Sequence, residues 1–444
     1  MMNAINILKL APDQPLIQDK QEIDRQYKYW RIRTFIGMYV GYAFYYFTRK
    51  SFTFAMPAMM VELGFTKAEL GILASVLSIM YAFSKFLSGV ISDKSNPRFF
   101  MGIGLILTGI VNIFFGLSSS LMIFIIFWGL NGWFQGWGWP PCSKLLTHWY
   151  SQTERGRWWG MWNTSHNVGG ALIPLIAAVC IQFLGWRSAL YIPGVLAIGM
   201  GVFLIYCLRD TPRSMGLPAV GEWRGDEVRA RKEERTSEVT AKDILMKFVL
   251  KNRILWVLAS AYFFVYILRT ALNDWICLYL HEAKGYSMLH AGSGIFWFEI
   301  GGFTGSLAAG WISDKIFAGK RGPVNVLFTL GVILIIGAVW MAPAGQLWWV
   351  SSLMFMVGFF IFGPQMLIGM AAAELSHHQA AGTATGFVGW FAYLGAAVAG
   401  YPLGKISQDW GWDGFFIALM GCGVLAGLLL LPLWAAKSNP EYAS

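Results

Sequence analysis

The sequence predicts an all-α membrane protein whose twelve transmembrane helices form two pseudo-symmetric bundles of six. Three observations lead to this prediction. Of the 444 residues, 56% are hydrophobic and only 13% are charged, whereas a soluble domain has roughly 25% charged residues. Twelve apolar stretches approach the ~20 residues that span a bilayer as a helix, and two motifs of the first half recur in the second. This composition excludes an ordinary soluble enzyme.

The twelve apolar stretches fall into two groups of six. They are residues 34–60, 69–91, 99–119, 121–147, 158–183, 187–208, 254–280, 291–312, 323–343, 346–371, 380–404 and 413–436. The interruption between the groups holds eleven Lys or Arg and eight Asp or Glu, so we expect a solvated connector there. The predicted parts are a tail (1–33), a first bundle (34–208), a connector (209–253), a second bundle (254–436) and a tail (437–444).

Basic residues are distributed unevenly between the two ends of these stretches. The side with both termini and the connector holds about 25 of the 34 Lys and Arg, and the opposite side about four. The positive-inside rule therefore places both termini and the connector in the cytoplasm. Residues 1–33 lack the apolar core and cleavage site of a signal peptide, so we expect a retained tail. The net charge of +10 reflects this distribution and does not indicate a nucleic-acid partner.

Two motifs repeat at nearly equal offsets of about half the chain. Tyr42-x3-Tyr46-x2-Arg49 recurs 220 residues later as Tyr262-x3-Tyr266-x2-Arg269. Gly89-x2-Ser92-Asp93-Lys94 recurs 221 residues later as Gly310-x2-Ser313-Asp314-Lys315. A duplicated six-helix unit of this kind is typical of secondary transporters, whose substrate site lies at the midplane between the repeats.

Charged residues inside the predicted spans are mostly positive. Five cations, Arg49, Lys50, Lys85, Lys144 and Arg269, lie there. Each costs roughly 2.5–3.5 kcal/mol at the centre of a membrane helix. Only two acids, Asp274 and Glu299, lie clearly within spans. Fixed ion pairs therefore cannot neutralise the interior, and a mobile anion would supply the missing charge.

The two repeated arginines are the strongest candidates for binding that anion. Each shares a helix face with the two tyrosines of its motif, and a pseudo-two-fold axis would bring Arg49 and Arg269 face to face. The planar guanidinium donates two parallel hydrogen bonds to a phosphate and keeps its charge on burial. The pattern predicts an oxyanion site. The alternative is that each arginine snorkels or pairs permanently with an acid.

Four further polar residues also lie within the predicted spans. Lys85 follows Tyr81 by four residues and would add a third cation, unless it only snorkels to the interface. Lys144 lies near the end of the fourth stretch, where we expect snorkelling. Asn163 and His166 are spaced to share a helix face, and His166 would strengthen phosphate binding as it gains a proton. The alternative for His166 is a histidine satisfied inside the bundle.

The two acids are expected to form a charge network. Asp274 lies about 140° around the helix from Arg269, too far to be its direct partner. We expect Asp274 and Glu299 to pair with Lys50 or an unliganded arginine in the empty carrier. Substrate would then compete for these cations and couple binding to closure.

Motifs of enzymes and metal sites are missing from the sequence. It has no Walker A loop, no G-x-S-x-G motif and no His/carboxylate arrangement. Its five cysteines and the His377-His378 pair have no metal-binding spacing. We therefore expect neither an enzyme nor an ATP-driven pump, and neither a cofactor nor a metal.

Several strings resemble a known family. They are YAFYYFTRK (42–50), SKF (84–86), SDKSNPR (92–98), NGWFQG (131–136), WNTSHNVGG (162–170) and FGPQMLIG (362–369). In these strings, and nearly end to end, the chain resembles the major facilitator superfamily. Within it, the chain resembles the organophosphate:phosphate antiporters, which take up glycerol phosphate and hexose phosphates in bacteria. The resemblance implies a monomeric carrier in the bacterial inner membrane that exchanges a sugar phosphate, with glucose 6-phosphate as the expected substrate, for inorganic phosphate by alternating access.

The resemblance also implies roles for individual residues. The phosphate-binding positions are Arg49, Arg269, Lys85 and His166. The positions that line the cavity are Tyr42, Tyr46, Tyr81, Asn163, Tyr266 and Tyr393. The surrounding charge network consists of Lys50, Asp274 and Glu299.

The chain departs from some members of the family. Phe362 stands where glycerol-phosphate carriers have a tyrosine, and Thr385 and Val388 replace charges of some hexose-phosphate carriers, which leaves the organic half of the substrate open. Residues 11–31 and 216–224 are most similar to the hexose-phosphate sensor branch, whose members bind glucose 6-phosphate and act on a membrane histidine kinase. A receptor with such a kinase as partner is the alternative function.

Overall fold

The computed structural model of the chain confirms the predicted all-α class. It describes residues 8–93, 95–225, 244–376 and 381–436. Each predicted apolar stretch corresponds to one helix or to two consecutive helices. The predicted C-terminal tail and the His377-His378 pair lie outside the described residues.

The first six stretches form eight helices. These are α2 (Lys20–Leu63), α3 (Lys67–Asp93), α4 (Pro97–Leu117), α5 (Leu121–Gln135), α6 (Trp139–Trp149), α7 (Gln152–Asn163), α8 (Ser165–Leu184) and α9 (Ser188–Cys207). The fourth stretch is broken between α5 and α6, where Gly136-Trp137-Gly138 precedes Pro140 and Pro141. Proline is accepted in a first helical turn because the N–H that it lacks would have no partner there.

The last six stretches form seven helices. These are α13 (Arg253–Glu282), α14 (Met288–Lys315), α15 (Arg321–Met341), α16 (Leu347–Glu374), α17 (Ala381–Val398), α18 (Tyr401–Asp409) and α19 (Gly411–Leu430). Four short elements complete the described chain: η1 (Arg213–Met215), α10 (Val220–Arg224), η2 (Ile244–Val249) and η4 (Leu431–Leu433).

Many of these helices are suited to a bilayer. Within the described ranges, nine are long and apolar enough to cross a membrane. The segments 34–60, 121–147 and 291–312 are not among the nine. The first holds Arg49 and Lys50, the second is broken in the middle, and the third is rich in glycine and holds Glu299. Twelve helical stretches of this length and order, nine of them apolar enough to span, make the chain a multi-pass membrane protein.

The chain divides into two compact units. The first comprises Met1–Arg49, Met80–Gly169 and Leu190–Glu238, and the second comprises Lys50–Ile79, Gly170–Ala189 and Val239–Ser444. Helices α2, α3 and α8 therefore contribute residues to both units.

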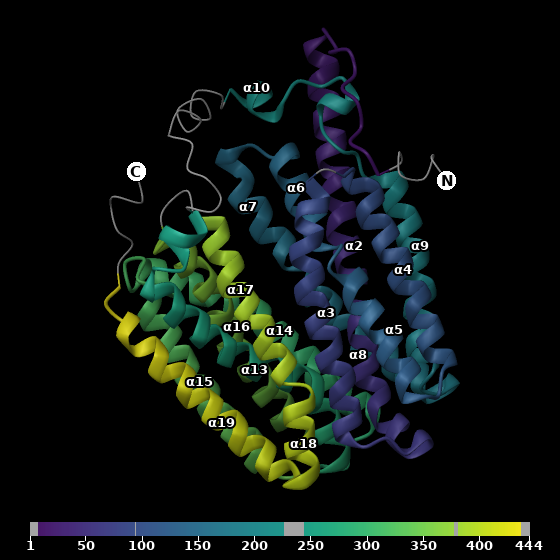
Figure 1. Ribbon diagram of the computed structural model, residues 1–444, viewed down its shortest axis with the longest axis vertical. Coiled ribbons are helices and arrows are strands. Elements are labelled where there is room, and N and C mark those ends of the chain that lie inside the picture. The colour runs from purple at the N-terminus through teal and green to yellow at the C-terminus, as the bar shows by residue number, and fades with distance from the viewer. Residues whose placement is uncertain (1–7, 94, 226–243, 377–380, 437–444) are drawn as a thin grey trace. The chain divides into compact units, whose positions relative to one another are not determined.

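Within the first unit, glycines allow α9 to approach two neighbouring helices closely. A side chain at Gly102 of α4 would meet Ile205 and the carbonyl of Gly201, both on α9. A side chain at Gly41 of α2 would meet Leu204 of α9. Helix α9 therefore packs closely against both α4 and α2, by the small-residue contacts common between membrane helices, and Figure 1 shows these helices in the same part of the fold.

The start of the connector packs against α2 and is not solvated as the sequence analysis expected. Helix α2 begins at Lys20, inside the predicted tail, and its first turns extend beyond α4 and α9, with the teal connector beside them (Figure 1). Tyr27 stacks on Trp223 at 4.2 Å, and the Trp223 indole donates to Asp24 at 2.6 Å. Leu217 is completely buried. Apolar and aromatic residues scattered through a polar segment explain this docking.

Within the second unit, α14 and α16 pack backbone to backbone. A Cβ at Gly301 or Gly305 of α14 would overlap the carbonyl of Phe355 or Phe359 on α16. Conversely, a Cβ at Gly358 of α16 would overlap the carbonyl of Phe298 on α14. Glycine is therefore required at this interface.

Candidate functional site

In the first unit, Arg49 of α2 is surrounded by aromatic rings. Its guanidinium carbon lies 4.1 Å from the ring centroid of Tyr81 and 5.0 Å from that of Tyr46. Its Nε donates to Oε1 of Gln135 at 3.3 Å. The rings stabilise the cation by their negative faces, and Gln135 fixes the direction of its Nε.

Gln135 of α5, which the sequence analysis missed, orients Arg49. Its Nε2 donates to the carbonyl of Tyr45 at 3.0 Å and to Oγ1 of Thr48 at 2.9 Å. The amide nitrogen is therefore engaged with the backbone side of α2, and the acceptor Oε1 faces Arg49. Asn131, one turn earlier, donates to the carbonyl of Thr48 at 3.0 Å. Two amides spaced i, i+4 in an apolar helix were the signal that could have found this network.

The first unit also brings together other predicted site residues. The imidazole of His166 lies 5.8 Å from the ring of Tyr46, and the ring of Tyr42 lies 5.9 Å from that of Tyr46. Nζ of Lys85 lies 4.9 Å from the ring of Trp139 on α6. Helices α2, α3 and α8 therefore supply one cluster around Arg49, and Lys85 contacts the adjacent α6.

Asn163 and His166 do not lie on one continuous helix as their spacing suggested. Helix α7 ends at Asn163 and α8 begins at Ser165, with Thr164 between them. His166 is buried, whereas Asn163 is exposed.

The second unit has a corresponding cluster around Arg269 of α13. The guanidinium carbon lies 5.1 Å from the ring of Phe362 and 5.6 Å from that of Tyr266. Tyr266 contacts Tyr393 of α17 with ring centroids 5.6 Å apart. Tyr262 donates its hydroxyl hydrogen to the carbonyl of Gln365 at 2.7 Å. Each repeated arginine therefore has aromatic neighbours from its own motif and from other helices.

Both embedded acids lie in the second unit and have polar partners. Nζ of Lys50 lies 2.6 Å from Oδ1 of Asp274, and both side chains are mostly buried. Glu299 is fully buried, and its Oε1 accepts a hydrogen bond from Nδ2 of Asn273 at 2.9 Å. Asp274 pairs with Lys50, one of the partners expected from the sequence. The role of Asn273 was not predicted, because Glu299 is 26 residues away in the chain.

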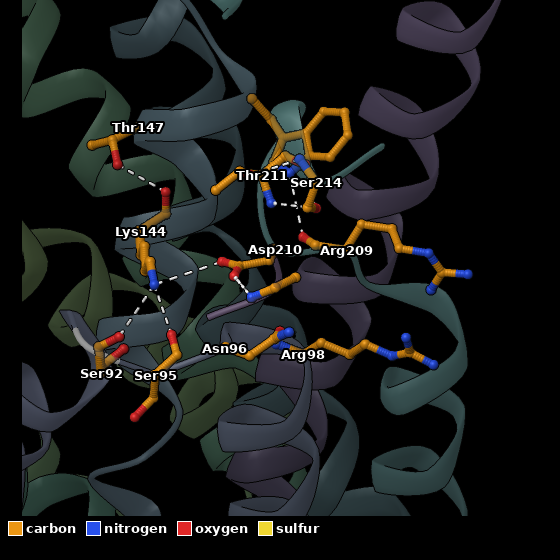
Figure 2. Close-up of polar contacts among 12 residues, drawn as sticks. Ser92, Ser95, Asn96, Arg98, Lys144, Thr147, Arg209, Asp210, Thr211 and Ser214 are labelled. Carbon is orange, nitrogen blue, oxygen red and sulfur yellow. Dashed lines mark hydrogen bonds and ion pairs between the residues drawn. The ribbon is translucent and has the colours of Figure 1, made fainter. Parts of the chain in front are cut away.

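The expectation that Lys144 snorkels to the interface is wrong. Its side chain is 8% exposed and lies 3.6 Å from the carboxylate of Asp210, which is 1% exposed. Nζ of Lys144 also donates to the carbonyl of Ser95 at 2.7 Å, and Figure 2 shows these groups around it. Asp210 lies just beyond α9, so a search for acids within spans could not find it. The embedded charges are therefore less positive than the sequence count.

The second oxygen of Asp210 binds the N-terminal segment. Its Oδ2 accepts a hydrogen bond from the backbone N–H of Ala11 at 2.9 Å. Nearby, the N–H of Asn96 donates to the carbonyl of Leu8 at 2.8 Å. The buried ion pair therefore joins α6 and the connector with the loop before α4 and residues 8–11.

Twelve helical stretches, with motifs that repeat between the two halves of the sequence, are typical of a membrane transport protein. Residues 38–400 match the model of the Major Facilitator Superfamily, and the chain belongs to this superfamily and within it to the organophosphate:phosphate antiporter family. The strings YAFYYFTRK, NGWFQG and FGPQMLIG, which carry the resemblance, lie on α2, α5 and α16, and these helices hold Arg49, its neighbour Gln135 and, beside Arg269, Phe362.

Known proteins similar to the chain include transporters and a sensor. A probable hexose phosphate transport protein of Chlamydia trachomatis serovar D is 57% identical over 433 residues, which are 95% of each chain. The membrane sensor protein UhpC of Escherichia coli K12 is 50% identical over 98% of this chain and 99% of its own. The fold is similar to that of a bacterial homologue of the lysosomal transporter Spinster, with a TM-score of 0.73, 14% identity, and coverage of 93% of this chain and 98% of the other.

Proposed function

We propose that the protein is a carrier that exchanges a sugar phosphate for inorganic phosphate by alternating access. Its preferred substrate is glucose 6-phosphate. The observation that supports this most is the pair of arginine clusters at repeated positions, each lined by tyrosines. The 57% identity to a protein named as a probable hexose phosphate transporter supports the choice of substrate.

In this proposal Arg49 and Arg269 both bind the phosphate group through their planar forks. Lys85 and His166 add positive charge, and the tyrosine hydroxyls accept or donate further hydrogen bonds. The sugar lies against Tyr42, Tyr81, Asn163, Tyr266 and Tyr393. The carrier functions as a monomer in a bacterial inner membrane, and the positive-inside distribution orients both of its termini toward the cytoplasm.

Uptake by reconstituted protein tests this function. Proteoliposomes loaded with inorganic phosphate are expected to accumulate labelled glucose 6-phosphate, and liposomes loaded only with chloride are expected to take up little. Competition by glycerol 3-phosphate measures how strongly the carrier selects the organic half of its substrate. Weak competition is expected, because Phe362 stands where glycerol-phosphate carriers have a tyrosine. Absence of both uptake and binding would contradict the proposal.

A receptor for external glucose 6-phosphate is the second candidate, because the chain is 50% identical to a membrane sensor protein. Such a receptor would act on a membrane histidine kinase. The same reconstitution separates the two functions: a receptor binds labelled glucose 6-phosphate without phosphate-driven uptake.

The acids of the charge network are expected to couple binding to closure. If phosphate competes with Asp274 for the Lys50 ammonium, the double variant Asp274→Asn/Glu299→Gln binds glucose 6-phosphate about tenfold more tightly but exchanges it more slowly. Affinity is measured by equilibrium binding and exchange by counterflow. The control neutralises two exposed acids of the same unit, Glu62→Gln/Asp409→Asn, and should change neither value. Unchanged affinity and exchange in the Asp274/Glu299 variant would rule out the coupling.

A further inference from the structure

Three arginines gather where α9 ends. Arg33 of α2 donates through Nη2 to the carbonyl of Tyr206 at 3.0 Å, and Arg209 donates through Nη1 to the same carbonyl at 3.0 Å. Arg98 of α4 donates through Nε to the carbonyl of Ile205. Three guanidiniums from three chain segments therefore converge on the last carbonyls of one helix.

Aromatic rings hold two of these cations in place. The guanidinium carbons of Arg209 and Arg33 lie 4.6 Å and 4.9 Å from the ring of Trp30. Nη1 of Arg33 also donates to the hydroxyl of Tyr29 at 2.5 Å. The cluster is therefore built into the fold and is not a set of unrestrained surface side chains.

The cluster has no acidic partner among the side chains that the structure describes. None of the three arginines forms an ion pair within 4.0 Å there. Asp210 follows Arg209 in the chain, but its carboxylate points toward Lys144, whereas Arg98 and Arg209 extend to the opposite side (Figure 2). Partial burial and the positive charges of Arg98 and Arg33 lower the pKa of Arg209. The three charges therefore repel one another.

Capping of α9 does not account for so much charge. The C-terminus of a helix carries roughly −0.5 of an elementary charge, whereas the cluster carries three positive charges. Each guanidinium has five N–H donors. Toward the residues that the structure describes, Arg98 donates only through Nε and Arg209 only through Nη1. Donors and positive charge both remain for an anion.

The surface beside the cluster is apolar and exposed. Tyr206 on α9 and Ile32 on α2 are 66% and 57% exposed, and Phe203 and Ile36, one turn further into the same helices, are also exposed. Helix α9 is one of the membrane-spanning candidates, with its span ending at Cys207, and the span of α4 begins at Pro97. The arginines therefore lie at the membrane boundary, next to a surface that contacts acyl chains.

We propose that Arg33, Arg98 and Arg209 form a binding site for the phosphate of an anionic phospholipid headgroup. Basic clusters at the cytoplasmic ends of membrane helices are suited to such lipids, and guanidinium forks match phosphate oxygens. The apolar surface of α9 and α2 favours a lipid over a free phosphate, because it would pack against the acyl chains of the same molecule. This site does not depend on the proposed transport function.

Native mass spectrometry of the full-length protein, titrated with phosphatidylglycerol or phosphatidylcholine, tests the site. The wild type is expected to bind phosphatidylglycerol about tenfold more tightly than phosphatidylcholine. The variant Arg98→Gln/Arg209→Gln is expected to lose this preference. The control Lys251→Gln/Arg253→Gln removes two exposed cations of the same predicted face and is expected to keep it.

Three results would overturn the proposal. The first is equal binding of both lipids by the wild type, which decides the question even where a variant fails to fold. The second is an equal loss of preference in the control variant, which would indicate a general charge effect. The third is displacement of phosphatidylglycerol by inorganic phosphate or glucose 6-phosphate at the same concentration, which would indicate a site for free phosphate.

Arg33→Gln provides a second variant, which removes a single charge and is expected to weaken the preference for phosphatidylglycerol.

Discussion

Lysine at position 49 or 269 is expected to abolish exchange of glucose 6-phosphate for phosphate. Lysine keeps the positive charge but replaces a planar fork by a single ammonium, so one of two parallel hydrogen bonds to phosphate is lost. A hydrogen bond to a charged group contributes about 1.5–3 kcal/mol, which corresponds to roughly a 10- to 150-fold loss of affinity. In the first unit, lysine would also lose the hydrogen bond from Arg49 Nε to Gln135.

Counterflow in proteoliposomes measures this effect. Arg187→Lys is the matched control, because Arg187 pairs with an exposed acid, Glu62. It should exchange at the wild-type rate. Wild-type counterflow from either Arg49→Lys or Arg269→Lys would refute the proposal that both arginines bind the phosphate group. Binding that is lost in these variants while the fold persists in gel filtration would support it.

Breaking the Lys144–Asp210 pair is expected to have the largest effect on stability. Removal of one partner of a buried ion pair leaves an uncompensated charge and costs about 3–5 kcal/mol. Lys144→Met and Asp210→Asn should therefore each destabilise the protein strongly. The double variant should recover much of the loss, because it leaves no buried charge. Asp210→Asn retains an oxygen that can accept the hydrogen bond from Ala11.

Thermal unfolding of the purified protein in detergent measures this double-mutant cycle. The exposed pair Lys405–Asp409, with side chains 49% and 44% exposed, is the control. Lys405→Met and Asp409→Asn should change stability by only about 0.3–0.5 kcal/mol, as is typical of exposed i, i+4 pairs. Additive losses at Lys144 and Asp210 would show that the two charges do not stabilise each other.

The proposed lipid site lies next to the Lys144–Asp210 ion pair in the first unit. Asp210 neutralises Lys144 on one side of the connector, while Arg209, the preceding residue, extends to the other side (Figure 2). The variant Asp210→Asn is therefore expected to weaken the ion pair without removing any of the three arginines. Lipid preference and thermal stability are separable measurements, so the two proposals can fail independently.

The repeated motif predicted the centres of both clusters but not their supports. The spacing of Tyr42, Tyr46 and Arg49 determines a common helix face, and the structure has Arg49 over the ring of Tyr46. Gln135 belongs to another helix, 86 residues away, and its contact with Arg49 depends on how α5 packs against α2. A sequence pattern within one helix contains no information about that packing.

Hydropathy predicted the spans but not where helices begin or break. Helix α2 starts at Lys20 because polar residues of the tail also form helix, and a window that averages hydropathy detects only the apolar part. The connector was expected to be solvated from its charge. Tyr27 and Trp223 nevertheless stack, because the burial of two large aromatic rings against each other stabilises the contact even in a segment that is rich in charged residues.

By itself the sequence determined the membrane class, the number of helical stretches, the two repeated motifs and the charged residues that lie within apolar stretches. These follow from composition and periodicity, which are local properties of the chain. Only the tertiary structure decided which groups the charged residues contact: Asp274 for Lys50, Asp210 for Lys144, and the carbonyls of α9 for Arg33, Arg98 and Arg209 outside the predicted spans. A buried charge is stabilised by whichever group packing brings within a few ångströms, and packing joins residues that are far apart in the chain.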